Sequence, residues 1–325
     1  MSGPASEIMR PGPASRLLLA PLLLAALAAC EPAGLAPAVP AAPPRDVAPP
    51  EPPVAEPGAS TLAARAYYAR VEANYLAQDL LRTDGGGADA PFTARDLAEN
   101  FVHIAFYDEF SERGGRLVPQ AVENRLHRWT EPVRVTVEFG ASVPAAQRAA
   151  DRAAIAGYVG RLSRITGLPM RMTARRANHT VLILNADERG AAAARIAMLA
   201  PGTGAAAVRS VTEMPPETYC TVFSFTTGGS AVYTRALTVI RGELPERLRL
   251  ACIHEELAQS LGLVNDWPRA RPSIFNDNEE FALLTRQDEM MLKMLYDPRL
   301  RPGMTLAEAR PIVETMAAEL MGGES

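Results

Sequence analysis

The chain has 325 residues, with 33 Lys and Arg against 37 Asp and Glu, which gives a net charge of −4 at neutral pH. No basic cluster accompanies this balance, so the composition disfavours binding to nucleic acid. About 265 residues follow position 59, which is enough for one large domain or for a small helical module and a mid-sized domain.

Residues 1–29 have the composition of a secretory signal peptide. Arg10 and Arg16 precede an apolar run over 17–27, and small residues stand immediately before Cys30. This pattern favours cleavage before Cys30 and lipidation of its thiol. An ordinary signal peptide with an incidental cysteine is the alternative. The first interpretation predicts an exported domain, anchored by lipid to a bacterial membrane, in the periplasm or at the cell surface.

Residues 30–59 are predicted to form a disordered tether behind that lipid anchor. Ten of the 28 residues from Glu31 to Gly58 are Pro, and little in this stretch could pack. At ~3 Å per residue such a segment can hold a domain tens of ångströms from the membrane. The chain starts at Met1 or at Met9, because both leave the signal intact.

Two cysteines remain once Cys30 carries lipid. Thiols in an oxidising compartment usually pair, so we expect a disulfide between Cys220 and Cys252. Two buried free thiols are the alternative. The bond would tie the helix around Cys252 to the strand expected over 221–225.

Residues 60–130 are predicted to form a small helical module. Apolar residues recur at helical spacing over Thr61–Leu81, and the glycines at 85–87 end that helix. Thr93 can cap a second helix over Ala94–Phe110, whose apolar residues share one face.

From residue 131 to the end, strands and helices alternate in an order that predicts an α+β domain with one mixed sheet packed on helices. The expected strands are Val133–Phe139, Thr180–Leu184, Thr221–Phe225 and Arg235–Ile240. The expected helices are Pro144–Ile165, Ala191–Leu199, Glu246–Leu261 and Arg286–Leu295.

The helix that begins after Pro245 contains an unusual motif. Residues 253–266 read I-H-E-E-L-A-Q-S-L-G-L-V-N-D. The active-site helix of a zincin metalloprotease needs two His four residues apart, so that both imidazoles bind one ion. Here His254 is followed at that spacing by Ala258.

If the zincin motif is aligned one residue later along the chain, its spacing is matched in this shifted frame by side chains of a different chemistry. Glu255 and Gln259 then take the positions of the two His, and Glu256 takes that of the general base. Gly262 stands at the turn, and Asn265 stands at the third-ligand position of the longer metzincin motif. The motif thus resembles a zincin helix in which an acid and amides replace imidazoles.

A second segment extends this resemblance. Residues 284–288 read L-T-R-Q-D and lead to Leu295-Tyr296, which is similar to the closing helix of metzincins. Both segments also resemble an uncharacterised bacterial family of secreted proteins and lipoproteins, a domain of unknown function with an E-E-x-x-Q-x-x-G-L-x-N-D helix. Residues 128–134 and 273–277 are similar to that family too. The resemblance covers about 96–305 and implies a zincin-like fold without an established activity.

The candidate metal ligands in the shifted frame are Glu255, Gln259, Asn265 and Asp266. Amide oxygens are poor zinc donors and suit harder divalent ions better. His254 is a candidate only in the unshifted frame, because it lies about 100° around the helix from Glu255. A divalent metal is therefore the one cofactor for which the sequence offers candidate ligands.

Three functions remain open. In the first, the domain is a non-catalytic pseudoenzyme that binds an envelope protein, a peptide or a glycan, and Gln259 and Asn265 satisfy Glu255 by hydrogen bonds. In the second, it is a metal-dependent peptidase in which Glu256 is the general base. In the third, it is a scaffold or spacer that binds through the helical module. A separate alternative for the motif itself is that Glu255, Glu256 and Gln259 form an ordinary polar stripe on a surface helix, without a site.

Overall fold

The computed structural model describes residues 54–322, apart from residues 115 and 202. The described residues belong to one compact unit. The signal peptide over 1–29, the lipidation site at Cys30 and the tether up to residue 53 lie outside them, and these features stay predictions. None of the helices in the described part is both long enough and apolar enough to cross a membrane.

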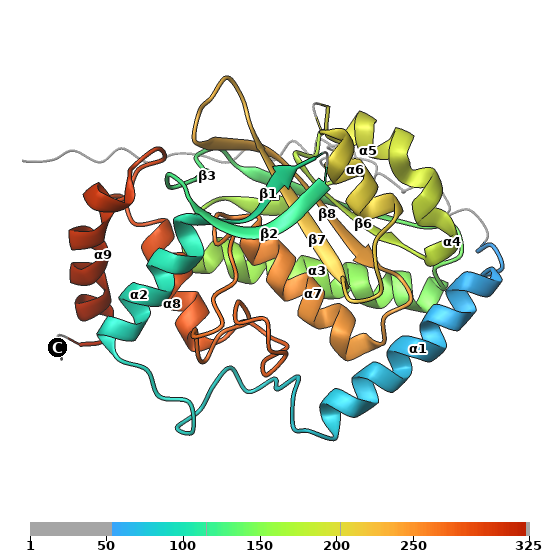
Figure 1. Cartoon of the computed structure of the whole chain (residues 1–325), viewed down its shortest axis with the longest axis horizontal. Coiled ribbons are helices and arrows are strands. Elements are labelled where there is room, and N and C mark those ends of the chain that lie inside the picture. The colour runs from blue at the N-terminus through green and yellow to red at the C-terminus, as the bar shows by residue number, and fades with distance from the viewer. Residues whose placement is uncertain (1–53, 115, 202, 323–325) are drawn as a thin grey trace, which may run out of the picture. The chain divides into compact units, whose positions relative to one another are not determined.

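Groups of helices and groups of strands follow one another along the described chain (Figure 1). The helices are α1 (Ala59–Leu76), α2 (Ala94–Ala105), α3 (Ala145–Thr166), α4 (Ala186–Arg189), η1 (Gly190–Ala192), α5 (Ala193–Leu199), α6 (Ala205–Thr212), α7 (Glu246–Gln259), α8 (Arg286–Leu295) and α9 (Leu306–Leu320). The strands are β1 (Tyr107–Arg113), β2 (Arg116–Glu123), β3 (Arg128–Trp129), β4 (Val133–Phe139), β5 (Met170–Met172), β6 (His179–Leu184), β7 (Cys220–Thr226) and β8 (Val232–Arg241).

A mostly parallel sheet forms the centre of the unit, with the strand order β3-β8-β6-β4-β5. Strand β7 pairs antiparallel with β8, from Cys220 opposite Ile240 to Thr226 opposite Tyr233. Strands β1 and β2 form a separate antiparallel hairpin. The predicted α+β class is therefore confirmed.

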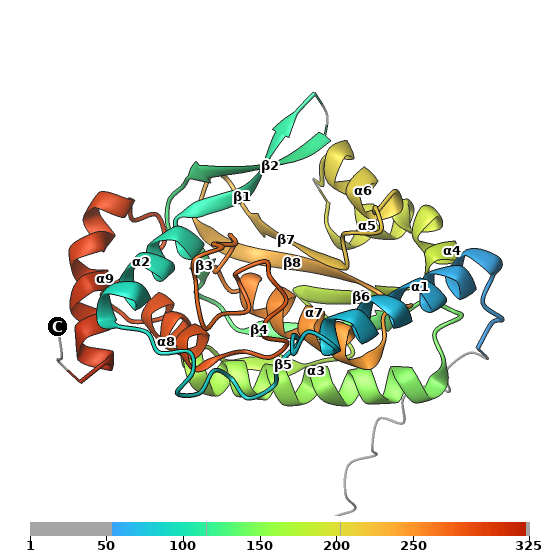
Figure 2. The same ribbon diagram turned by 60° about the horizontal axis from the view of Figure 1, so that its bottom comes forward.

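Helices cover both faces of the central sheet (Figure 2). On one face, apolar side chains of α3 and α7, such as Ile155 and Leu257, pack in the same core as Val181 of β6. On the other face, Ile196 of α5 and Val211 of α6 pack against a second set of sheet residues. Two-sided burial explains why β6 reads as a continuous apolar run rather than as an alternating one.

Reciprocal hydrogen bonds begin several helices. In α2, the Thr93 side chain accepts from the backbone N–H of Asp96, whose carboxylate accepts from the N–H of Thr93. The same capping box begins α8 at Thr285 and α9 at Thr305. These caps satisfy N–H groups that have no partner within the helix. They also account for the agreement between the predicted and observed bounds of α8.

The segment 60–130 differs from its predicted form. The first helix ends at Leu76 instead of Leu81, and the second ends at Ala105 instead of Phe110. The helical reading of residues 107–110 was wrong, because this stretch pairs with β2. The segment therefore contains a hairpin as well as two helices, and its separation as a domain from 131–325 stays a prediction.

Three further elements were not predicted, although α9 begins with the capping box at Thr305. Strand β5 has only three residues, and α6 lies in an Ala-rich stretch without a strong cap. Helix α9 contains Pro311, a residue that normally ends or kinks a helix.

Candidate functional site

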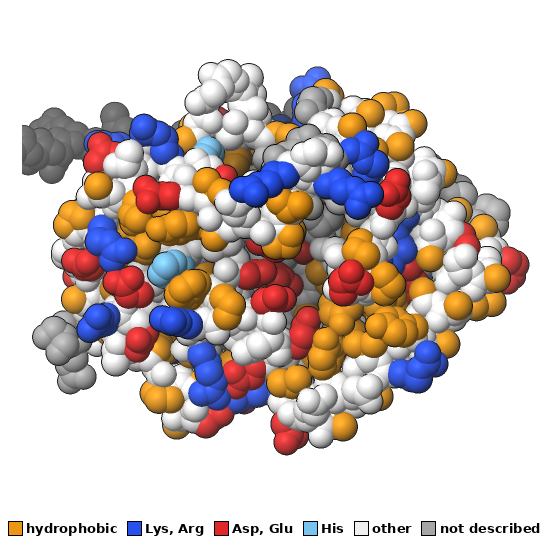
Figure 3. Space-filling view, in the orientation of Figure 1, with side chains coloured by type: hydrophobic (Ala, Val, Ile, Leu, Met, Phe, Trp, Pro, Cys, Tyr) orange, Lys and Arg blue, Asp and Glu red, His pale blue; other side chains and the backbone are white. Residues whose placement is uncertain are grey.

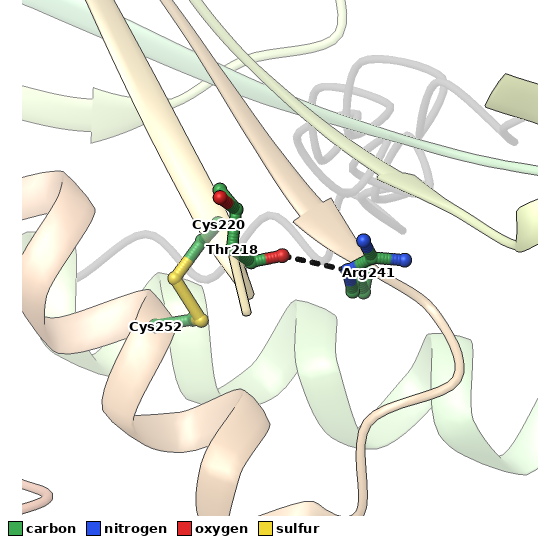
Figure 4. Close-up of a disulfide and its surroundings, with 4 residues drawn as sticks. All are labelled: Thr218, Cys220, Arg241 and Cys252. Atoms are coloured by element: carbon green, nitrogen blue, oxygen red, sulfur yellow. Dashed lines mark hydrogen bonds between the residues drawn. A yellow bond between two sulfur atoms is a disulfide. The ribbon is translucent and has the colours of Figure 1, made fainter. Parts of the chain in front are cut away.

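Helix α7 is joined covalently to the edge strand β7. The Cys220–Cys252 disulfide links the first residue of β7 to the middle of α7 across 32 residues of chain (Figure 4). The Arg241 guanidinium donates to the Thr218 carbonyl just before β7. The predicted disulfide is confirmed, and it holds α7 beside the strand.

The turn after α7 is held by side chains from distant segments. The Trp129 indole N–H donates to the Ser260 carbonyl at 2.9 Å, and the Tyr296 hydroxyl donates to the Leu261 carbonyl at 3.0 Å. Gly262 has φ 125°, and a Cβ placed there would lie 2.3 Å from the His127 carbonyl oxygen. A glycine is therefore required at this close approach.

The loop that follows turns Asn265 away from α7. The backbone N–H groups of Val264 and Asn265 both donate to the Ile104 carbonyl, and the Asn265 side-chain amide donates to the His103 carbonyl at 2.9 Å. Asn265 is only 4% exposed. Its amide is thus committed to the end of α2 and does not line the cavity described below.

The start of α8 fixes the loop that carries two further carboxylates. The buried carboxylate of Asp288 accepts hydrogen bonds from Ser273 Oγ at 2.6 Å, from the Ile274 N–H at 3.1 Å and from Thr285. The residues just beyond, Asp277 and Glu279, have left-handed backbones with φ 53° and 58°. The Leu-Thr-x-x-Asp segment therefore anchors the loop from which these two acids project.

A cavity of about 480 Å³ lies between α7, the β1–β2 hairpin, β7 and this loop. Acidic side chains gather on this face of the molecule (Figure 3). The acids that line the cavity are Asp108, Glu109, Glu217, Glu255, Glu256, Asp266, Asp277 and Glu279. No Lys, Arg or His is among its described lining residues. This acidic pocket is the candidate functional site.

Glu256 is the most deeply placed of these acids. It is 4% exposed, and its Oε2 atom has no hydrogen-bond partner among the described residues. Burial raises its pKa well above the usual range, and the charges of Glu109 and Asp266 raise it further. Burial likewise raises the pKa of Glu255, with Asp266 and Glu256 adding to the effect.

The pKa values of the acids around Glu255 and Glu256 are raised as well. Burial and the nearby Asp266 and Asp277 carboxylates raise the pKa of Glu109 to about 8. Burial, with Asp277 and Glu279, raises the pKa of Asp266 to about 7. Burial and Asp277 raise the pKa of Glu279 to about 7. Like charges in one poorly solvated space thus raise one another's pKa values toward neutrality or above it.

His254 lies on a different side of α7 and faces the protein core. Its Nδ1 accepts from the Leu284 N–H at 3.0 Å, and its ring stacks on Tyr158 at 3.9 Å between ring centroids. The Tyr158 hydroxyl donates to the His254 carbonyl. Burial lowers the pKa of His254 to about 3. The residue is therefore a neutral packing and hydrogen-bonding group and takes no part in the acidic pocket.

The structure brings together some of the candidate ligands. Glu255, Gln259 and Asp266 line the pocket with Glu256. The Gln259 amide donates to Asp266 Oδ1 at 3.4 Å, so it bonds to that acid rather than to Glu255. The expected network of Gln259 and Asn265 around Glu255 is therefore not formed.

Metal-ligating atoms come close together at one point. Oxygens of Glu255 and Glu256 and the sulfur of Cys220 lie within 4.8 Å of one another. The sulfur is part of the disulfide, so it cannot act as a thiolate ligand. The two carboxylates that remain are not the three-ligand set, rich in imidazole, of a catalytic zinc ion. The residues present do not fit zinc.

Sequence reasoning did not find Glu109, Glu217 or Glu279. Glu109 and Glu217 come from segments distant in the chain from residues 253–266, Glu279 lies 13 residues after Asp266, and none of the three has a spacing that marks it. Asp277 could be noticed only as an acid near the motif. An Asp-Glu pair inside a hairpin strand was the one available signal for Glu109.

A family model described as a protein of unknown function, DUF2927, matches residues 94–315. The chain belongs to this family. No curated protein matches the chain, and no solved structure matches it. The DUF2927 match includes the hairpin, α7, the anchored loop and α8, and therefore most of the segments that line the acidic pocket.

Proposed function

We propose that this DUF2927 protein is a membrane-tethered, zincin-like binding domain without hydrolase activity. The single observation that carries the proposal is the orientation of α7. This helix presents Glu255, Glu256 and Gln259 to the pocket, while its one histidine lies outside the pocket lining and accepts a hydrogen bond from the Leu284 N–H. Carboxylates and an amide occupy the face on which a zincin helix needs imidazoles.

The zincin-like interpretation is supported by the order of the elements around this helix. Strands β4, β6, β7 and β8 precede α7, and an anchored loop and the Leu-Thr-x-x-Asp start of α8 follow it. Gly262 makes the turn that the protease motif requires. Because folds host many functions, this order supports the architecture and leaves activity to the site residues.

Membrane tethering is supported by the N-terminal sequence and by the disulfide. Small residues precede Cys30 after an apolar run, and disulfides persist mainly in oxidising compartments outside the cytosol. Mass spectrometry of the mature protein should detect acyl chains on residue 30. A Cys30→Ser variant should leave the membrane fraction, and its retention there would contradict the lipid anchor.

The non-catalytic assignment is tested by metal content and by activity. Full-length protein, purified in detergent without chelators, should contain no stoichiometric zinc in elemental analysis. One zinc per chain, or a chelator-sensitive peptidase activity that Glu256→Gln abolishes, would overturn the assignment. In that case Glu256 would take the general-base role.

A further inference from the structure

The acidic pocket has a deep carboxylate that no group in the described structure satisfies. Glu256 is 4% exposed and lines the pocket, and its Oε2 has no hydrogen-bond partner. A buried acceptor without a partner lowers the stability of the folded chain, and does so more when it is charged. A bound donor that enters the pocket would recover this free energy.

The acidic lining of the pocket favours a ligand that is positively charged and donates hydrogen bonds. Glu255, Glu256, Asp266 and Glu109 come from α7, the following loop and the hairpin, and the charges of Asp266, Glu256 and Glu109 all raise the pKa of Glu255. No basic side chain among the described lining residues offsets them. Because these pKa values are raised, the acids share protons in the free protein, and a bound cation would favour their ionised forms and release those protons. An anionic ligand would instead oppose their ionisation further.

The dimensions of the pocket favour an organic cation over a metal ion. A volume of about 480 Å³ is of the size that holds a small ligand or a long side chain. Within the described chain, the one close group of ligating atoms has only two usable carboxylates, from Glu255 and Glu256. Two adjacent carboxylates match the several N–H donors of a planar guanidinium group.

We propose that the pocket binds the guanidinium group of an arginine side chain from a polypeptide, with Glu255 and Glu256 as its direct partners. Asp266 and Glu109 add negative charge around the bound group. This proposal rests on the proposed function, because it names the ligand class of the same non-catalytic site.

The test uses full-length protein in detergent and a matched pair of probes in titration calorimetry. The first probe is the peptide acetyl-Gly-Arg-Gly-amide, and the second replaces Arg with citrulline, which is similar in shape and uncharged. We expect the Arg peptide to bind roughly tenfold or more tightly than the citrulline peptide at pH 8. The double variant E255Q/E256Q should lose this preference, and E319Q, at an exposed acid outside the pocket, should keep it.

Equal affinity for the two peptides would overturn the proposal, and so would an unchanged preference in E255Q/E256Q. Thermal unfolding of each variant shows whether it is folded. Tight binding of CaCl2 or ZnCl2 that excludes the Arg peptide would identify a metal site instead. Binding of spermidine but not of the Arg peptide would identify a free polyamine site.

The same titrations separate failure of this proposal from failure of the proposed function. Mass spectrometry of the recovered probes reports any cleavage, and elemental analysis of the same sample reports zinc. Cleavage or stoichiometric zinc contradicts the non-catalytic assignment. Absence of binding, with intact peptides and no zinc, contradicts only the arginine proposal.

Discussion

Replacing Asp266 with Asn should stabilise the protein increasingly as the pH rises. Burial and the neighbouring Asp277 and Glu279 raise the pKa of Asp266 from 3.8 to about 7. The folded chain therefore holds this proton more tightly than the unfolded chain does. The carboxyl contributes its full stabilising effect below pH ~4, and it loses that effect as the pH rises through about 7.

The expected change in the free energy of unfolding follows from the shift in the pKa of Asp266. A change from 3.8 to about 7 corresponds to roughly 4 kcal/mol for an isolated group at 1.36 kcal/mol per pH unit. Solvent at the pocket mouth and proton sharing among the acids reduce this free energy. We therefore expect Asp266→Asn to gain about 1–3 kcal/mol of stability over wild type at high pH. The variant keeps an oxygen that can accept the hydrogen bond from Gln259.

The assay is urea unfolding of wild type and Asp266→Asn at pH 5 and pH 8. The free energy of unfolding of the variant, relative to wild type, should increase between the two pH values. Glu319→Gln is the control, because Arg299 lowers the pKa of that exposed acid below its ordinary value of 4.5. Glu319 is therefore ionised in both the folded and the unfolded chain, and the relative stability of this variant should barely change between pH 5 and pH 8. A relative stability of Asp266→Asn that stays constant or falls would refute the electrostatic account of the pocket.

Three further substitutions test the framework that positions the pocket. Cys220→Ser removes the bond to Cys252 across 32 residues and should lower the free energy of unfolding by about 3–4 kcal/mol. Reduction of wild type with dithiothreitol should have the same effect, and a loss below ~1 kcal/mol would contradict the expected constraint on the unfolded chain. Gly262→Ala should cost about 3 kcal/mol or more because its Cβ meets a carbonyl oxygen at 2.3 Å, whereas Gly157→Ala, with open space in α3, should be neutral or stabilise by ~0.5–1 kcal/mol. Asp288→Asn weakens the anchor of the loop and should cost about 1–3 kcal/mol in denaturant unfolding at pH 7, and an unchanged midpoint would show that the loop is held by other contacts.

Elements with strong local signals were predicted well. Helix α7 was expected over Glu246–Leu261 and is observed over Glu246–Gln259, because Pro245 precedes a long run of helix-forming residues. Helix α8 has its predicted bounds because Thr285 and Asp288 form a capping box. In both cases the residues that determine where the helix begins lie within one or two turns of that position in the sequence.

Features that depend on contacts outside their own segment were predicted poorly. The pairing of β1 with β2 overrides the helical pattern that continues from α2 past Ala105. The position of Asn265 is a similar case, because its spacing from Glu255 suggested a common site. Hydrogen bonds to the end of α2 turn its side chain elsewhere. Such contacts form only when the segments pack together.

The sequence by itself determined the α+β class, the polar motif of α7 and the pairing of Cys220 with Cys252. Helical geometry also separated His254 from Glu255, because neighbouring residues leave a helix about 100° apart. Only the tertiary structure decided that Glu109 and Glu279 join Glu255 and Glu256 around one pocket. Periodicity specifies which way a side chain leaves its own element, but the distance between elements depends on how their apolar faces pack.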